Sequence, residues 1–340
     1  MLNAPVPNTK KLLSGAEFKI FDPRDPSSAS CGAELLDSSV AKRGDRWWMY
    51  LAGQAEQVGA PDIFSATLPA GAPLTATGWK PAVGEDGKVV PVAERNFSSS
   101  WDGGGGRHCP SYVKGWNPQK RHWVERLYHA GAAENIGGPY TIGFLEWDGT
   151  KWSDQAEPAF IATETWERGS VFEPNLIYHD GKWKLWYVAG STRENYLVHG
   201  YSESEDGATN WANHRTFAPP EMNMFDFCVR QRGSSYDAIF SRVSLTSGTP
   251  PPETGLWWSR AKNPSANFAD WSKPVQIMTA EDRQWHSGPF KPSFQFHEQH
   301  PDHAFVFFDG MYRTDDPGPF PFAFTLGCNE IDLPEGGPTE

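Results

Sequence analysis

The chain has 340 residues, of which 29 are Pro, 33 are Gly and 16 are Trp. This length suits one large all-β domain or two ordinary domains, and so much Pro and Gly favours short strands joined by turns. Lys and Arg number 30 against 42 Asp and Glu, a formal net charge of -12. Nucleic acid and anionic membranes are therefore poor partners, because phosphate binding needs clustered cations. A neutral carbohydrate fits better.

No apolar stretch approaches the roughly 20 residues that span a bilayer. Residues 1–13, MLNAPVPNTKKLL, contain no apolar core of signal-peptide length, so we expect a cytoplasmic protein. The cysteines are far apart and form no CxxC pair, which argues against a structural zinc site. We expect free thiols, and two disulfides remain the alternative. The four are Cys31, Cys109, Cys228 and Cys328.

Five segments along the chain share one plan. Each has a polar or acidic residue, an apolar run, a turn with Gly or Asp, and an aromatic-rich run that ends in a small residue. They recur about every 50–70 residues, and such internal repetition is typical of propellers and solenoids. The segments are Leu36–Gly53, His108–Gly131, Glu173–Gly190, Phe225–Ser241 and Phe290–Gly310.

A second pair of strands follows several of these hairpins, and its turn ends on Trp, as in SEDGATNW (Ser204 to Trp211). Four short antiparallel strands per unit are the content of a propeller blade. We therefore predict an all-β, single-domain, five-bladed β-propeller over residues 1–340, with a β-sandwich or two unrelated β domains as the alternative. Residues 1–30 are expected to form an N-terminal entry segment. Residues 315–340 are expected to pair with the N-terminal blade and close the ring.

In a propeller the first strand of each blade lines the axis, so residues at the starts of these strands converge on one mouth. Aligning the five segments places at this position Asp37, His108, Glu173, Asp226, and either His286 or Lys291. Carboxylates packed around a narrow axis repel one another and lose solvation, so at least one should have a raised pKa. Such an acid–base pair is what glycoside hydrolysis requires. Individually, Asp37 could cap a turn, Asp226 could pair with Arg230, and Glu173 could be solvated.

The segments Leu36–Gly53 and Glu173–Gly190 resemble the inner hairpins of five-bladed propeller glycoside hydrolases, the family 43 and family 32-like enzymes. The turn Ser204–Trp211 resembles the Ser-x-Asp-Gly-x-x-x-Trp turn of such blades and of sialidases. The resemblance implies a glycosidase with Asp37 as general base. It places Glu173 at the position of the pKa-tuning residue and Asp226 at that of the acid, with the usual Asp and Glu exchanged.

The resemblance also implies inversion at the anomeric carbon and no required cofactor. His286 matches a histidine that helps to hold a central calcium ion in some relatives. The proton donor is expected to be Glu173 or Asp226. The Gly-rich run Trp101–Cys109 is expected at the mouth, with the sugar pocket shaped by Trp101, Arg107 and His108 from this loop and by Trp285, His286 and Lys291 from the last blade.

Two other classes remain open. One is a lyase or cyclase, in which His108, His286 and Lys291 supply acid–base groups or stabilise an enolate. The other is a carbohydrate-binding propeller without catalysis. A lectin is expected to carry equivalent shallow sites between blades, whereas these five units differ in length and in mouth residues, which favours one central site.

Overall fold

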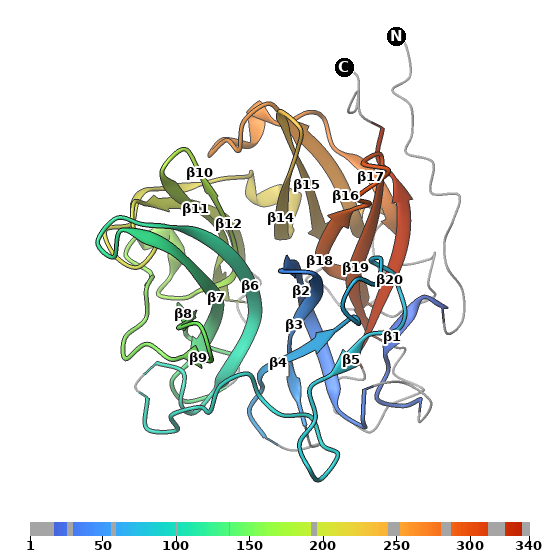
Figure 1. Cartoon of the computed structure of the whole chain (residues 1–340). Helices are drawn as coiled ribbons and strands as arrows, with labels where there is room; N and C mark the ends of the chain where they lie inside the picture. The colour runs from blue at the N-terminus through green and yellow to red at the C-terminus, as the bar shows by residue number, and fades with distance from the viewer. Residues whose placement is uncertain are drawn as a thin grey trace.

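The computed structural model describes residues 17–25, 30–55, 59–99, 101–135, 137–191, 196–243, 252–279, 287–311 and 324–334. Five antiparallel sheets of four strands stand around a central axis (Figure 1). This five-bladed β-propeller confirms the predicted fold class. Helical structure in these residues is limited to short 3-10 turns, and no helix there is long and apolar enough to cross a membrane.

Four of the sheets are built from consecutive strands, with the innermost strand first. The first is β2 (Glu34–Arg43), β3 (Arg46–Gln54), β4 (Asp62–Thr67) and β5 (Lys80–Pro81). The second is β6 (Gly106–Asn117), β7 (His122–Ala132), β8 (Tyr140–Trp147) and β9 (Trp152–Ser153). The third is β10 (Val171–His179), β11 (Lys182–Ser191), β12 (Tyr196–Ser204) and β13 (Ala212–Thr216). The fourth is β14 (Met224–Arg232), β15 (Ser235–Arg242), β16 (Gly255–Ala261) and β17 (Val275–Thr279).

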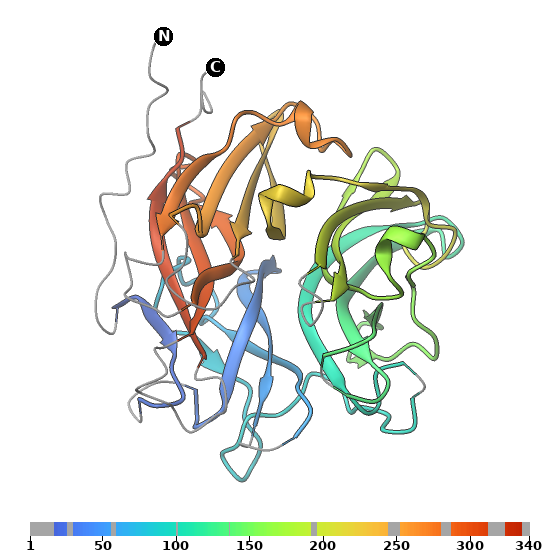
Figure 2. The same ribbon diagram turned by 180° about the vertical axis from the view of Figure 1, so that it is seen from behind.

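The fifth sheet joins the two ends of the chain. It contains β18 (Ser287–Phe296), β19 (His303–Met311) and β20 (Phe324–Asp332), and its outer strand is β1 (Lys19–Phe21). Figure 2 shows β1, in blue, beside the red strands of this sheet. The sequence analysis expected residues 315–340 to pair with the first blade. Instead the N-terminal segment completes the last sheet, and β20 contacts the first sheet through the Phe324 N–H, which donates to Glu34 Oε1 at 3.2 Å.

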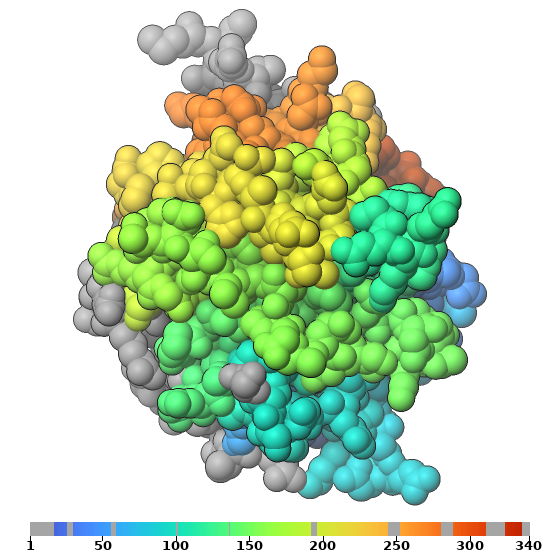
Figure 3. Space-filling view, turned by 90° about the vertical axis from the view of Figure 1, so that its left-hand side faces the viewer, coloured from blue at the N-terminus to red at the C-terminus, as the bar shows by residue number. Residues whose placement is uncertain are grey.

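Large apolar and aromatic side chains fill the spaces between neighbouring sheets. Trp152 meets Tyr50 of the first sheet edge-on at 5.5 Å, and Trp271 meets Phe227 at 5.0 Å in a cluster that includes Trp186 of the third sheet. Figure 3 views the molecule from the side, where the green and yellow segments of the chain lie directly against each other on the surface. The tryptophans that end the repeat units therefore serve mainly in packing.

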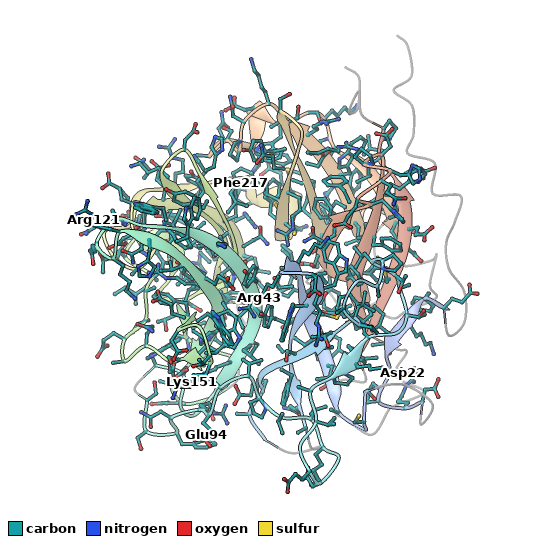
Figure 4. All side chains as sticks on the ribbon, viewed as in Figure 1. Asp22, Arg43, Glu94, Arg121, Lys151 and Phe217 are labelled. Carbon is teal, nitrogen blue, oxygen red and sulfur yellow. The ribbon has the colours of Figure 1, made fainter. Side chains whose placement is uncertain are left out.

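Arg43 shows how charge is accommodated between sheets (Figure 4). Its Nε donates to Glu125 Oε2 at 2.6 Å, and its Nη1 donates to the Tyr50 hydroxyl at 3.0 Å. Its guanidinium also lies 4.6 Å from the centre of the Trp147 ring. The carboxylate and the aromatic faces stabilise the charge of Arg43, which is partly removed from water. Because Glu125 and Trp147 belong to the second sheet, these contacts join the first and second sheets.

Side chains near the axis connect each inner strand to the next. In four of the five sheets a Ser or Asn near the start of the inner strand accepts a backbone N–H from the neighbouring sheet: Ser39 from Tyr112 (3.0 Å), Ser111 from Leu176 (3.2 Å), Asn175 from Val229 (3.2 Å) and Ser293 from Val40 (3.0 Å). In the fourth sheet Cys228 occupies this position. There Arg230 reaches across the axis to the carbonyl oxygens of Phe294 (3.2 Å) and Val40 (3.4 Å).

Candidate active site

A β-bulge near the start of the inner strands directs side chains into the axis. The pairing register shifts at this point in all five sheets. Asp37, Cys109, Glu173 and Lys291 have positive φ values of 53°, 58°, 55° and 54°. Pro follows the last three of these residues, and Pro is tolerated inside sheets at bulges because it has no N–H to donate to the ladder. The Glu-Pro pair near the start of β10 therefore marks a bulge that re-aims a carboxylate.

The positive φ values of these four residues also correct the alignment of the five repeated segments. In the second sheet the residue equivalent to Asp37 is Cys109, one position beyond His108, because both carry the left-handed bulge conformation. In the fifth sheet the equivalent residue is Lys291. A one-residue slip in a strand exchanges its faces, so the exact bulge position decides which side chain points to the axis.

The structure brings Asp37, Glu173, Asp226 and Lys291 together around a cavity of about 30 Å³ on the axis. Lys291 Nζ forms an ion pair with Glu173 Oε2 and lies 3.5 Å from Asp226 Oδ1. All four side chains are nearly buried. By the size that a water molecule requires, the cavity has room for about two waters.

Asp226 is the carboxyl group of this cavity with the clearest proton-donor character. Burial and the charge of Asp37 raise its pKa to about 7, against the opposing effect of two hydrogen bonds. Those bonds come from the Ser241 hydroxyl and from the Lys291 backbone N–H at 2.8 Å, and both end on Oδ2. Near neutral pH a large fraction of Asp226 therefore carries a proton.

Asp37 is held from two sides. Its Oδ2 accepts the Cys109 N–H at 3.2 Å, and its own N–H donates to Asp309 Oδ2 at 2.7 Å. Asp309, on β19, is fully buried, and burial together with the neighbouring Asp37 raises the pKa of Asp309 well above its ordinary value. Sequence reasoning missed Asp309. Its signal is an acidic residue in the otherwise apolar run FVFFDG, where other repeats end in small residues.

A second, larger cavity of about 450 Å³ adjoins the first, and Glu173 borders both. Its wall includes His108, Tyr140, Arg168, Phe172, Glu173 and Phe225. The rings of His108 and Tyr140 meet edge-on at 4.5 Å, and Tyr140, Phe172 and Phe225 continue as neighbours at 5.5 and 6.1 Å. Burial lowers the pKa of His108 to about 4, so this imidazole is neutral at physiological pH. The cavity thus offers aromatic faces beside polar groups.

Trp101 and Arg107 occupy structural positions and do not line either of these cavities, contrary to the prediction. Arg107 is fully buried, donates from Nε to Asp102 Oδ2 at 2.7 Å and pairs with Asp154. Trp101 is 4% exposed and stacks on His129 at 5.1 Å. The Gly-rich loop is held against β7, where the Gly105 N–H donates to Ala132 O at 2.8 Å, so it does not stand open at the mouth.

Trp285 and His286 lie outside the described residues, and the proposed calcium ligand is therefore still a prediction. Within the described residues there are two groups of three side chains whose potential metal-ligand atoms lie within 4.8 Å of one another. The first group is Asp37, His108 and Cys109, and the second is Asp102, His129 and Asp154. Arg107 already neutralises the second group through Asp102 and Asp154. In the first group, the Lys291 ammonium acts on the Cys109 thiol through its charge and a side-chain hydrogen bond.

No protein-family model matches the chain, and no curated protein matches its sequence. Solved structures are similar in fold. A thermostable family-43 glycoside hydrolase has a TM-score of 0.60 and 14% identity, covering 91% of this chain and 97% of its own. The native arabinanase Arb43A of Bacillus subtilis has the same TM-score and identity, covering 91% and 99%. A family 117 glycoside hydrolase of Zobellia galactanivorans has a TM-score of 0.62 and 12% identity, covering 94% and 90%. The chain therefore has the five-bladed propeller fold seen in these glycoside hydrolases, at low sequence identity.

Proposed function

We propose that the protein is a glycoside hydrolase whose reaction takes place where the two cavities meet. The observation that carries this proposal is the pair of carboxyl groups on the axis: Asp37, positioned by Asp309 and Cys109, and Asp226, whose pKa is about 7. Glycosidic hydrolysis needs one carboxyl group that takes a proton and one that gives a proton. The fold shared with glycoside hydrolases is consistent with this chemistry, although fold alone does not define function.

The roles follow from the surroundings of each group. Water occupies the small axial cavity, and Asp37 removes a proton from it as it attacks the anomeric carbon. Asp226 gives its proton to the leaving oxygen, so that the elements of water are added across the cleaved C–O bond. Glu173 is ion-paired with Lys291, and it therefore acts mainly by its charge and by contact with the sugar. We propose inversion at the anomeric carbon, by resemblance to the family.

The larger cavity suits the sugar. Carbohydrate pockets combine apolar faces with a few oriented polar groups, and Tyr140, Phe172 and Phe225 supply the former while His108 and Glu173 supply the latter. The axial cavity is too small for a sugar ring, which separates the positions of water and sugar. The proposed partner is a glycoside or polysaccharide.

A second candidate function is elimination at the same site, producing an unsaturated sugar. The observation that favours it is Lys291, an ammonium group among carboxyl groups, which could stabilise a developing enolate while the neutral imidazole of His108 accepts a proton. This reaction would require a substrate with an acidic C–H next to a carbonyl or carboxylate.

A panel of aryl glycosides and of plant and bacterial polysaccharides tests these proposals. Hydrolysis is expected to release reducing sugar, with the first-formed anomer opposite to that of the substrate by NMR. Asp37→Asn and Asp226→Asn should each lower kcat by about 10²- to 10⁴-fold. An unsaturated product that absorbs in the ultraviolet would replace hydrolysis by elimination, and saturable binding without any turnover would refute both.

A further inference from the structure

His108 and Cys109 are consecutive, yet their side chains converge. In a regular strand such neighbours point to opposite faces of the sheet. The positive φ of Cys109 and the bulge around it break this alternation, so that His108 Nδ1 lies 2.6 Å from Cys109 Sγ. The second sheet therefore presents an imidazole and a thiol to one point.

Asp37 brings a third donor to this point from the first sheet. A carboxylate oxygen of Asp37, a ring nitrogen of His108 and the sulfur of Cys109 all lie within 4.8 Å of one another. The hydrogen bonds from Cys109 N–H to Asp37 and from Asp37 N–H to Asp309 fix the two strands in register. Asp37 is 8% exposed and Cys109 is 2% exposed, so the group is shielded from bulk water.

Lys291 is the cation nearest to this group, because its charge and a side-chain hydrogen bond act on the Cys109 thiol. Four carboxyl groups, those of Asp37, Glu173, Asp226 and Asp309, are buried near the axis. Among the described residues, Lys291 alone of the lysines and arginines forms an ion pair with any of them. Among these four, Asp37 has no lysine or arginine partner in the described part of the chain, and a divalent ion between Asp37 and Cys109 would pair with its carboxylate.

We propose that Asp37, His108 and Cys109 form a Zn²⁺ site in the wall between the two cavities. Carboxylate, imidazole and thiolate are all zinc ligands, whereas a sulfur donor disfavours Ca²⁺ and Mg²⁺. Three protein ligands leave the fourth tetrahedral position open, as in catalytic zinc sites. At ordinary Zn–N and Zn–S lengths the two donor atoms stand about 3.5 Å apart, so His108 and Cys109 must separate by about 1 Å to admit the ion.

Cysteine spacing in the sequence does not reveal these three donors, because Asp37 belongs to the first sheet and His108 and Cys109 belong to the second. With an ion bound, Asp37 would be a ligand and no longer a free base, and the ion would supply the activation of water that the proposed hydrolysis assigns to Asp37. The inference reaches beyond the proposed hydrolysis, since it concerns binding of an ion and is measured without any substrate. Either idea can fail while the other stands.

Titration of the chelator-treated protein with Co²⁺ and then Zn²⁺ tests the site. We expect one ion per chain, visible d–d bands typical of tetrahedral Co²⁺, a thiolate-to-metal charge-transfer band, and displacement of both by Zn²⁺. Zn²⁺ should also raise the Tm, because a ligand that binds only the folded state stabilises it. The wild-type spectrum alone already reports on the sulfur ligand, so the test does not depend on a variant that folds.

Cys109→Ser should remove the charge-transfer band and most of the Zn²⁺-dependent rise in Tm, and His108→Gln should weaken binding while it keeps the band. Cys31→Ser and Cys328→Ser are matched controls, one at an exposed thiol and one at a buried thiol, and should leave both readouts unchanged. A wild-type protein that binds no Co²⁺, that binds it without sulfur ligation, or that loses the band only in Cys31→Ser would overturn the proposal.

Discussion

Lys291 and Glu173, which are 118 positions apart in the sequence, form an ion pair on the propeller axis. Their side chains are 10% and 6% exposed, so each ion is largely removed from water. Removing one partner of a buried pair leaves an uncompensated charge and costs about 3–5 kcal/mol. Lys291→Met should therefore lower the free energy of unfolding by an amount of this size, measured by urea denaturation.

The double variant Lys291→Met/Glu173→Gln separates charge from packing. It should recover most of the lost stability, because neither ion then remains, but it should not recover activity. Full stability in Lys291→Met alone would show that the ion pair contributes little.

The pH dependence of activity should report Asp226. Its pKa of about 7 means that the proton donor is lost above neutral pH, so kcat/KM should fall about tenfold per pH unit on the alkaline side. Ser241 donates to this carboxyl group and so lowers its pKa. Ser241→Ala should therefore move the alkaline limb to higher pH. Ser259→Ala, a buried hydroxyl of β16 that donates to Ser272 O, is the matched control and should leave the limb in place.

Asp226 should also make the protein less stable as pH rises. Its folded-state pKa lies above the ordinary value of 3.8, so the folded state binds the proton more tightly than the unfolded chain does. The resulting stabilisation is complete below about pH 4 and is lost as pH rises through about 7. Asp226→Asn, which resembles the protonated group, should gain the most Tm relative to wild type at about pH 8, less at about pH 5 and least at about pH 4. Parallel Tm curves for the two proteins would contradict this.

Asp309 is expected to be a positioning residue. It accepts the backbone N–H of Asp37, and an Asn amide oxygen can accept the same bond, whereas Ala cannot. Asp309→Ala should lower kcat by about 10- to 100-fold with little change in KM, because Asp37 is misplaced. Asp309→Asn should retain most of the activity. Equal losses in both variants would mean that the charge of Asp309, rather than its hydrogen bond, matters.

Ring closure predicts the effect of truncation. Deleting residues 1–22 removes β1 and exposes the edge of β20, so the Tm should fall and light scattering should reveal aggregation. A second variant that ends at residue 315 keeps β1 but lacks β20, and this variant should not fold at all. A circular permutant that rejoins these ends and opens the chain elsewhere is the control, and it should fold.

The repeat plan was enough to predict the sheets and the convergence of Asp37, Glu173 and Asp226, since the first strand of a blade must face the axis. The repeat plan did not predict which residue of the second sheet is equivalent to Asp37. Pairing register depends on where a bulge falls, and the bulge exchanged His108 for Cys109. Asp309 belongs to a second strand, which the first-strand rule does not consider. The Gly-rich loop suggested a mouth because Gly is common in loops, but its glycines instead allow close approach to β7.

The reach of Arg230 across the axis has a kinetic consequence. Its guanidinium spans the fourth, fifth and first sheets at the inner end of the small cavity, and Gln295 Nε2 donates to the same Val40 carbonyl at 2.5 Å. A sugar cannot leave through the far end of a passage closed in this way. In the proposed hydrolysis, substrate and product therefore share one opening, so product is expected to compete with incoming substrate, and a long polymer is not expected to thread through the ring during successive cleavages.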